Sequence, residues 1–391
     1  MYDAIIVGAR CAGAATAMLL ARRGHRVLLV DRATFPSDVP HGHLLHRGGP
    51  ARLERWGLLD RVAASAPPIT AIASDYGDFL LSGRDILVDG APLGIGPRRR
   101  VLDQILLEAA VEAGADLRTG FAVQDYIGDG SRITGIRGRA GAGRTLVTEQ
   151  ATVTIGADGR NSRLARTVGA PAYEETPPLT CWYFSYWSGV PAEGLELYSR
   201  GRRAILAFPA DDGLLAIFVA WPASALPLVR SDIPRHFTEA LLEVPDLADR
   251  VRAGRQEDRY SGAPDLPNFL RRPHGPGWAL VGDAGCHKDP FLALGMCDAF
   301  RDAELLANAL DDAFTGVRPP DAALASYHRE RDAATLPAYR LNALIAGTMA
   351  PPEEMLRLRA AVRGDPAATR RYFLRHEGLE EPSASYLQTI P

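Results

Sequence analysis

Three short glycine-containing motifs, each directly after an apolar run, lie far apart in this chain. The runs 4–7, 151–155 and 278–281 have the continuous apolar character of buried parallel strands. The motifs that follow them are Gly8-Ala9-Arg10-Cys11-Ala12-Gly13, Gly156-Ala157-Asp158-Gly159 and Gly282-Asp283-Ala284. Strands that end in glycine and small residues are typical of α/β folds in which turns approach a ligand closely. We therefore expect all three motifs to contact one ligand.

Length and composition limit the alternatives. The 391 residues are too many for one ordinary core, so we expect at least two structural units. A net charge of -3 gives no electrostatic reason to expect nucleic acid, and no apolar stretch reaches the roughly 18 residues of a membrane span. The first strand is predicted to begin within three residues of the N-terminus, so we expect no signal peptide. The four cysteines form no CxxC pair. These features favour a cytoplasmic protein. We expect a monomer or a homodimer and leave the choice between them open.

The first motif has the pattern of a dinucleotide-binding turn. Gly8 allows a tight turn, and Gly13 allows the following helix, predicted over 14–23, to pack closely on the strand. Asp31 ends the next apolar run, 18 residues after Gly13, close to the spacing of a carboxylate that binds a ribose hydroxyl. Arg10 replaces the usual middle glycine. Its side chain either neutralises a pyrophosphate or points outward, and an ordinary strand-turn-helix is the alternative to dinucleotide binding.

Together the three motifs resemble those of the flavoprotein monooxygenase superfamily typified by para-hydroxybenzoate hydroxylase. That family has an N-terminal GxGxxG, a central DG and a later GD, here similar to 8–13, 158–159 and 282–283. The resemblance implies FAD as the cofactor, with NADPH or NADH as a transient reductant. It implies an α/β fold in which a Rossmann-like FAD-binding domain carries an inserted α+β substrate domain with a mostly antiparallel sheet, followed by C-terminal helices.

The chain divides into three expected regions. The FAD-binding domain takes residues 1–70, 96–170 and 273–315. The substrate domain takes 71–95 and 171–272, and the C-terminal helical region takes 316–391.

The resemblance also assigns roles to individual residues. It places Asp283 on the ribityl chain, Pro290 beside the flavin ring, and the backbone N–H groups of Gly295 and Met296 at the flavin carbonyl edge. Asp158 is implied near the pyrophosphate. Further residues are expected to contact the cofactor: Gly8, Arg10, Cys11, Ala12, Gly13, Asp31, Arg32, Arg47, Arg99 and Val123. Among them Arg99, which opens a predicted helix, is favoured as a bidentate phosphate ligand over a solvated basic turn, and Arg47 is the weaker candidate.

Two side chains are expected to take part in catalysis beside Pro290. Lys288 is the one lysine among 44 basic residues and lies in the segment after the GD motif. An ammonium there can stabilise an anionic reduced flavin, orient a peroxide or bind an acidic substrate. The alternative is an ion pair with Asp289 or another acid. His43 is placed near the flavin, with surface polarity as the alternative. His41, His43 and His46 lack cysteines or carboxylates at metal-binding spacing, so we expect no metal.

The aromatic residues of the predicted substrate sheet are candidates for the wall of an apolar pocket. They are Trp182, Tyr183, Phe184, Tyr186, Trp187, Phe208, Phe218 and Trp221. Most must be core residues, and Tyr183 and Trp221 are predicted to contact the substrate.

The function expected from these features is FAD-dependent monooxygenation through a flavin C4a-hydroperoxide. The substrate is a small-to-medium organic compound, aromatic or polyketide-like, and molecular oxygen is the second substrate; a partner flavin reductase is possible as the source of electrons. Three alternatives share the motifs: a reductase of the geranylgeranyl type, a flavin halogenase and a non-catalytic flavin protein. The halogenase resemblance is weaker because no lysine precedes Lys288 and the Trp-x-Trp-x-Ile-Pro motif is absent.

Overall fold

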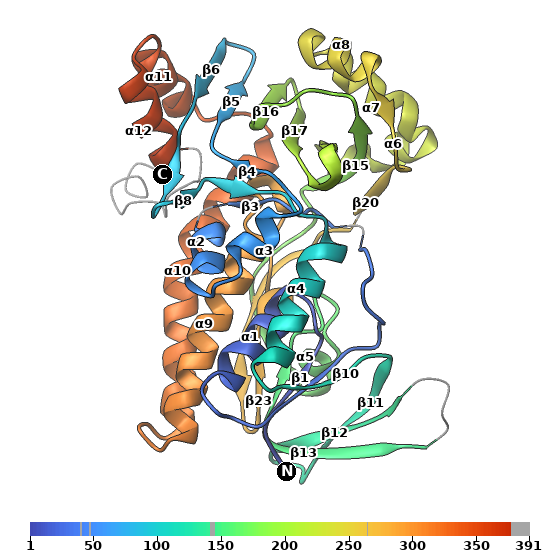
Figure 1. Ribbon diagram of the computed structural model, residues 1–391, viewed down its shortest axis with the longest axis vertical. Coiled ribbons are helices and arrows are strands. Elements are labelled where there is room, and N and C mark those ends of the chain that lie inside the picture. The colour runs from blue at the N-terminus through green and yellow to red at the C-terminus, as the bar shows by residue number, and fades with distance from the viewer. Residues whose placement is uncertain (40, 47, 141–144, 264, 377–391) are drawn as a thin grey trace.

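Parallel strands form the centre of the lower half of the molecule (Figure 1). The computed structural model describes residues 1–376 except 40, 47, 141–144 and 264. The parallel strands, in spatial order, are β10 (Asp116–Arg118), β2 (Val27–Val30), β1 (Tyr2–Val7), β13 (Val147–Gly156) and β23 (Trp278–Leu280). Because β1, β13 and β23 are neighbours in register, the three glycine motifs that follow them meet at one edge of this sheet.

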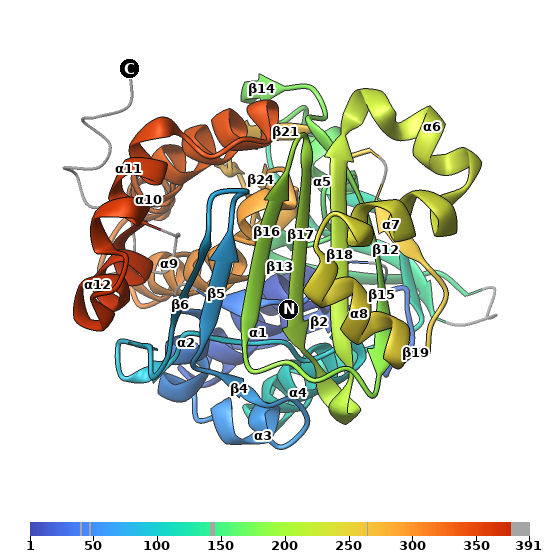
Figure 2. The ribbon, with the colours of Figure 1, turned by 90° about the horizontal axis from the view of Figure 1, so that it is seen from above.

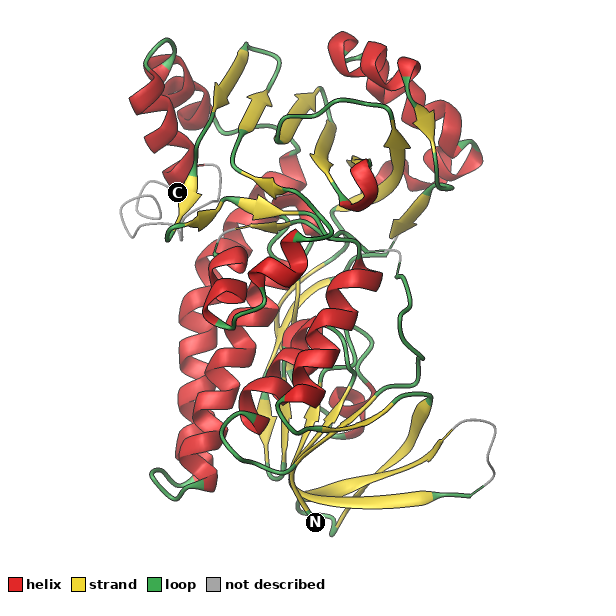
Figure 3. Cartoon of the chain, in the orientation of Figure 1, coloured by secondary structure: helices red, strands yellow, loops and turns green. Residues whose placement is uncertain are grey.

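Helices cover one face of the parallel sheet, as Figures 1 and 3 show. They are α1 (Cys11–Ala21), α2 (Gly49–Arg55), α3 (Leu59–Ala63), α4 (Arg99–Glu112), α9 (Gly295–Phe314) and α10 (Pro320–Thr348). Helix α1 packs between α4 and α9, and α10 packs on α9. Buried alanines on α1 allow the close approach of its neighbours.

The opposite face is covered by an antiparallel extension of the same sheet. Strand β11 (Phe121–Gly128) pairs with β12 (Ile133–Ala140), which pairs with the first half of β13. Phe121 and Ile136 pack there on Ile5 and Leu28. The short strand β22 (His274–Gly275) pairs with β23, and the short helix α5 (Arg163–Thr167) follows the second motif.

A second, mostly antiparallel sheet forms the upper half, seen from above in Figure 2. Its order is β19 (Arg255–Gln256), β15 (Thr180–Ser188), β18 (Leu215–Pro222), β17 (Arg203–Pro209), β16 (Leu195–Arg200), β5 (Ile72–Asp75) and β6 (Leu80–Gly83). Strand β20 (Ser261–Ala263) also pairs with β15. Three helices cover its outer face: α6 (Leu226–Ser231), α7 (Ile233–Leu242) and α8 (Pro245–Ala253).

Small sheets join the two halves. They are β14 (Ala172–Thr176) with β21 (Asn268–Arg271) and β24 (Cys286–His287), β3 (Leu45–His46) with β9 (Gly94–Ile95) and β4 (Pro68–Ile69), and β7 (Leu87–Val88) with β8 (Ala91–Pro92). The parallel sheet, the inserted antiparallel sheet and the C-terminal helices thus follow the predicted architecture. The residue boundaries assigned to the three regions stay a prediction.

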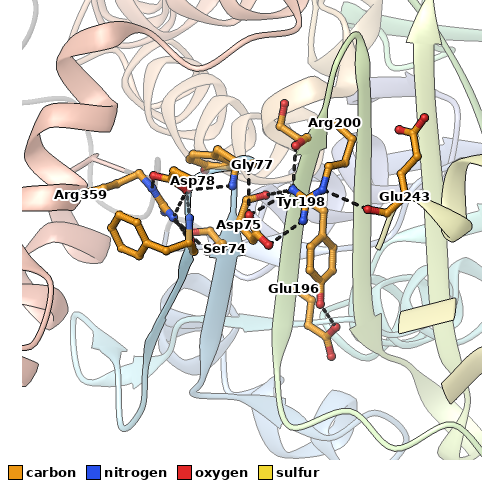
Figure 4. A network of polar contacts seen from close by, with 12 residues as sticks. Ser74, Asp75, Gly77, Asp78, Glu196, Tyr198, Arg200, Glu243 and Arg359 are labelled. Atoms are coloured by element: carbon orange, nitrogen blue, oxygen red, sulfur yellow. Dashed lines mark hydrogen bonds and ion pairs between the residues drawn. The ribbon is translucent and has the colours of Figure 1, made fainter. Parts of the chain in front are cut away.

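The C-terminal helices α11 (Glu353–Val362) and α12 (Pro366–His376) dock on the β5–β6 hairpin. Figure 4 shows the fully buried Arg359 of α11 reaching this hairpin. Its guanidinium donates to Ser74 Oγ at 2.5 Å and to Asp78 Oδ2 at 3.1 Å. On the other side of the hairpin, Arg200 of β16 binds Asp75 Oδ2 at 2.6 Å. The hairpin is therefore held between the upper sheet and the C-terminal helices.

Candidate functional site

A cavity of about 870 Å³ lies where the two halves of the molecule meet. Residues from all three glycine motifs line it, together with the loop between β2 and β3 and the inner face of the upper sheet. Most of the predicted site residues are in its wall: Gly8, Arg10, Cys11, Ala12, Asp31, Arg32, His43, Arg99, Val123, Asp158, Asp283, Lys288, Pro290, Gly295 and Met296. Arg47 lies outside the described residues.

Gly8 and Gly13 shape the turn between β1 and α1. Gly8 has φ +107°, and a Cβ added there would lie 2.3 Å from the carbonyl oxygen of Ala157 in the second motif. A Cβ on Gly13 would lie 1.8 Å from the carbonyl oxygen of Gly8. Gly13 does not line the cavity; it lets α1 pack directly on the turn. The N-terminus of α1 has no side-chain cap, so its first backbone N–H groups face the cavity side of the turn.

Arg10 and Arg99 share one buried carboxylate. Arg10 Nη1 lies 2.6 Å from Asp103 Oδ2, and Arg99 Nη2 lies 2.9 Å from Asp103 Oδ1. Asp103 is fully buried on α4, one turn after Arg99, and it also accepts from the Cys11 thiol at 3.4 Å. Sequence reasoning missed Asp103, although the Arg99–Asp103 spacing of four residues on a helix was a usable signal. The carboxylate fixes both guanidiniums in the cavity wall.

Asp31 ties the end of β2 to the first motif. Its carboxylate accepts from the backbone N–H groups of Ala9 and Ala33, each at 2.8 Å. Each oxygen has a second lone pair, and the residue lines the cavity. This position is compatible with the predicted hydrogen bond to a ribose hydroxyl.

Two further carboxylates in the cavity wall have acceptor capacity to spare. Asp158 Oδ2 accepts from the Arg163 backbone N–H at 2.7 Å, whereas Asp158 Oδ1 is buried and has no hydrogen-bond partner among the described residues. Asp283 follows Gly282, whose φ is +62°, and we find no hydrogen bond to its carboxylate within the described part of the chain. A buried acceptor such as Asp158 Oδ1 requires a donor from a ligand or solvent.

The segment after the GD motif is held rigidly through Asp289. The Asp289 carboxylate accepts from the Thr180 hydroxyl at 2.6 Å and from the Phe291 backbone N–H at 3.1 Å. Asn268 Oδ1 accepts from the Asp289 N–H at 2.6 Å, and the Asn342 amide donates to the Asp289 carbonyl at 2.9 Å. Strand β15, strand β21 and helix α10 therefore fix the segment that carries Pro290 into the cavity wall.

Lys288 lines the cavity as a member of an ion pair. Its ammonium pairs with Asp298 in the first turn of α9, and Arg301 binds the same carboxylate at 2.7 Å. Burial works to lower the pKa of Lys288, but the attraction of Asp298 outweighs it and the pKa lies above its ordinary value. The ion-pair alternative is therefore present, with Asp298 and not Asp289 as the partner. The Lys288 charge stays in the wall beside Pro290.

His43 lines the cavity with both ring nitrogens hydrogen-bonded. It is fully buried; its Nδ1 lies 3.0 Å from the Gly96 carbonyl, and its Nε2 lies 2.9 Å from the Tyr186 hydroxyl. Both ring nitrogens thus have hydrogen-bond partners within the protein, and the catalytic role expected of His43 stays a prediction. The ring packs edge-on against Phe208, with centroids 5.1 Å apart.

Acidification is expected to destabilise the protein through His43. Burial lowers the pKa of His43 to about 3 in the folded protein, against 6.5 for an ordinary histidine. Between these values the unfolded chain binds a proton that the folded chain does not, so stability falls as the pH falls through this window. Urea unfolding should show a steeper loss of stability in the wild type than in His43→Gln. Equal pH dependence in both proteins would contradict this assignment.

The loop between β2 and β3 covers the cavity and is held by two arginines. Arg10 donates to Ser37 Oγ at 3.0 Å, and Arg98 pairs with Asp38 at 2.9 Å. Arg98 also stacks on the ring of Tyr186, 4.5 Å from the centroid. Val39 and His41 of this loop line the cavity.

The upper sheet contributes an apolar end to the cavity. Its lining residues are Trp182, Phe184, Leu206, Phe208, Phe218, Ala263 and Leu266. Tyr183 and Trp221, the predicted substrate contacts, lie on the opposite face of the sheet, where Trp221 packs against Phe237 of α7. This prediction was wrong because successive residues of a strand point to opposite faces. Trp182 and Phe184 occupy the face that Tyr183 was expected to occupy.

No cluster of three or more His, Cys, Asp or Glu side chains with the geometry of a metal site occurs among the described residues. His43 and His46 instead bind backbone carbonyls, those of Gly96 and Leu292. In the part of the chain that the structure describes, none of the helices has the length and apolar character that crossing a membrane requires.

Comparison with known proteins identifies the family. A family model described as an FAD binding domain matches residues 1–338. The chain belongs to this family. Phenazine 1,6-dicarboxylic acid hydroxylase PhzS of Lysobacter antibioticus is 28% identical over 390 residues, which cover 85% of this chain and 90% of PhzS. Squalene epoxidase 3 of Arabidopsis thaliana is 27% identical over 345 residues, 79% of this chain and 60% of the epoxidase.

Among solved structures, the flavin-dependent brominase Bmp2 superposes with a TM-score of 0.80 over 97% of this chain and 94% of Bmp2, at 19% identity. At this identity the likeness shows the fold alone. The predicted fold class and the predicted membership of the FAD-dependent monooxygenase superfamily are confirmed. The protein is an FAD-dependent oxidoreductase of this superfamily, in which related monooxygenases typically use NAD(P)H as the reductant.

The cavity fits FAD by its own chemistry. The N-termini of α1 and α9 both open on it, and neither has a side-chain cap. Their first N–H groups are therefore available to phosphate and carbonyl oxygens. The unpartnered Asp158 Oδ1 and the carboxylate of Asp283 can accept from hydroxyl groups. Gly295 opens α9, and a Cβ built on it would meet no atom within 4 Å, so the helix end faces open space.

Proposed function

We propose that this protein is a monooxygenase that inserts one atom of O₂ into a small-to-medium, aromatic or polyketide-like compound, with NADPH or NADH as electron donor. The balance of the reaction is substrate, O₂, NAD(P)H and a proton giving oxygenated substrate, NAD(P)⁺ and water. FAD supplies the activation of oxygen when it is bound and reduced. The observation that carries the proposal is one continuous cavity with a polar end made by the glycine motifs and an apolar end made by the upper sheet.

Residues of the polar end would hold and orient the cofactor. We assign phosphate binding to Arg10, Arg99 and the N-terminus of α1, and hydroxyl binding to Asp31 and Asp283. Asp103 keeps the two guanidiniums in place. The N-terminus of α9 carries positive electrostatic potential and would stabilise negative charge on a bound cofactor.

Residues of the apolar end would hold the substrate and exclude water. The loop between β2 and β3 closes one side, and the segment held by Asp289 closes another. Exclusion of water prevents wasteful loss of the activated oxygen before it reaches the substrate. One similar protein is named a phenazine dicarboxylic acid hydroxylase and another a squalene epoxidase. Hydroxylation and epoxidation are therefore both consistent with the proposal.

Oxygen uptake tests the proposed function. Purified FAD-loaded protein is mixed with NADPH or NADH, with and without candidate substrates, under labelled O₂. The proposal expects substrate-stimulated oxygen uptake and one labelled oxygen atom in the product. Reduction of an alkene without oxygen uptake would instead indicate a reductase, and electron supply only from an added flavin reductase would replace NAD(P)H as the direct donor.

Removing the Asp283 carboxylate is expected to weaken FAD binding without unfolding the protein. In Asp283→Ala the cofactor loses a charge-assisted hydrogen bond worth about 1.5–3 kcal/mol, so its dissociation constant should rise about 10–100-fold. The matched control is Asp249→Ala, which removes an exposed acid on α8 that pairs with Arg252. Fluorescence titration of the apoproteins with FAD measures both constants. Wild-type affinity in Asp283→Ala would contradict the assigned role.

A further inference from the structure

The apolar end of the cavity has a wall of stacked aromatic rings. Phe184 of β15 stacks on Phe218 of β18, with ring centroids 4.5 Å apart and an interplanar angle of 18°. Phe208 of β17 stacks on the other side of Phe218 at 5.6 Å and 13°. The register of the sheet sets this arrangement, because Phe184 pairs with Phe218 across β15 and β18. Trp182 and Leu206 extend the wall along the same face.

Three polar side chains beside this wall already have partners within the protein. The Trp182 indole N–H donates to the Thr180 hydroxyl at 2.7 Å. The two ring nitrogens of His43 are bonded to the Gly96 carbonyl and the Tyr186 hydroxyl. Lys288, a cation in the cavity wall, is paired with Asp298. The positive charges of Lys288 and Arg301 are thus already balanced by Asp298 and Asp302, so a substrate carboxylate would meet no net positive charge from this cluster.

The consequence is a preference for neutral substrates. Moving a charge from water to an apolar site without a partner costs several kcal/mol, whereas an apolar group gains about 25 cal/mol for each Å² that it buries. We propose that the wall formed by Trp182, Phe184, Leu206, Phe208 and Phe218 selects uncharged, apolar substrates and rejects carboxylates. This inference rests on the proposed function, since it takes the apolar end as the place of the substrate.

Two probes of the same shape and different charge test the preference. At neutral pH, 2-naphthol is uncharged and 2-naphthoate is an anion. Equilibrium dialysis against FAD-loaded protein should show that 2-naphthol binds at least about tenfold more tightly than 2-naphthoate. Equal or tighter binding of 2-naphthoate would overturn the proposal, and so would failure of 2-naphthol to bind.

A charge placed in the wall should weaken the preference for the neutral probe. Leu206 is half-buried on β17 and lines the cavity, so Leu206→Arg brings a guanidinium to the apolar end without filling a closed core. We expect the preference for 2-naphthol to shrink by at least about tenfold, because a carboxylate now finds a bidentate partner. The matched control is Leu80→Arg, on β6 of the same sheet, where the leucine is 59% exposed. An unchanged preference in Leu206→Arg, or an equal change in the control, would contradict the proposal.

Binding and turnover separate this inference from the proposed function. Tight binding of 2-naphthol by a protein that oxygenates no substrate would count against the monooxygenase assignment and leave the selectivity intact. Oxygenation of carboxylate substrates in preference to neutral ones would overturn the selectivity and leave the monooxygenase assignment intact.

Discussion

Asp103→Asn is expected to destabilise the protein by about 3–5 kcal/mol and to reduce FAD retention sharply. The amide keeps the shape of the carboxylate but removes the one negative charge that Arg10 and Arg99 share. The Asp103 side chain is 0% exposed, so water cannot reach this position and solvate the two guanidiniums after the charge is lost. Two guanidiniums would then repel each other in the cavity wall and leave their present positions.

The control for this variant lies on the same helix. Glu112 is exposed at the end of α4 and pairs with Arg61 at 2.9 Å. Glu112→Gln removes an ion pair of a kind worth at most about 1 kcal/mol, so stability and FAD content should stay close to the wild type. Chemical unfolding and the visible absorbance of bound flavin measure the two effects. Equal behaviour of Asp103→Asn and Glu112→Gln would show that the buried carboxylate does not organise the site.

Gly13→Ala is expected to abolish FAD retention. The added methyl group would lie 1.8 Å from the Gly8 carbonyl oxygen and 3.1 Å from the Ala157 side chain. Since both neighbours belong to turns that follow parallel strands, α1 must move away from the sheet to relieve the clash. Overpacking of this kind costs at least about 1–3 kcal/mol, and here it also displaces the helix N-terminus from the cofactor phosphates.

Gly347→Ala provides the same chemical change at a harmless position. Gly347 lies near the end of α10, and a Cβ there would meet no atom within 4 Å. Alanine favours a helix over glycine by up to about 1 kcal/mol, so this variant should be as stable as the wild type or slightly more so. Retention of FAD by Gly13→Ala at the level of Gly347→Ala would refute the tight-turn geometry.

Local sequence was sufficient for the elements and for the gathering of the motifs. An apolar run that ends in glycine can be recognised from one strand and the turn that follows it. The parallel register of the strands then brings these turns together. The first helix was also predicted within a few residues of its observed bounds: the expected 14–23 is observed as Cys11–Ala21. Both features depend on patterns that the chain carries within short segments.

Side-chain contacts between residues far apart in the chain could not be predicted from the sequence. The Arg10–Asp103 contact joins residues 93 positions apart and exists only because α1 packs beside α4. Lys288 was compared with its neighbour Asp289, but the Asp289 side chain turns to Thr180 and leaves Asp298 as the partner. Residues adjacent in the sequence therefore need not be in contact, because their side chains can point in different directions.

The prediction that Tyr183, and not Trp182, faces the cavity was wrong for a different reason. Strand β15 is buried on both faces, against the cavity on one side and α7 on the other. A strand with one wet face alternates apolar and polar residues, which reveals its orientation, but residues 181–187 are aromatic or small on both faces. Only the three-dimensional position of β15 above the FAD domain could decide which residues face the ligand.

The most direct test of the central claim is a titration of the purified apoprotein with FAD, followed by flavin fluorescence and visible absorbance. We expect saturation at one FAD per chain in the wild type, and a large loss of affinity in Asp283→Ala and Asp103→Asn but not in Asp249→Ala or Glu112→Gln. A folded wild-type protein that binds no FAD, or that binds it equally well in all four variants, would contradict the assignment of this cavity to the cofactor.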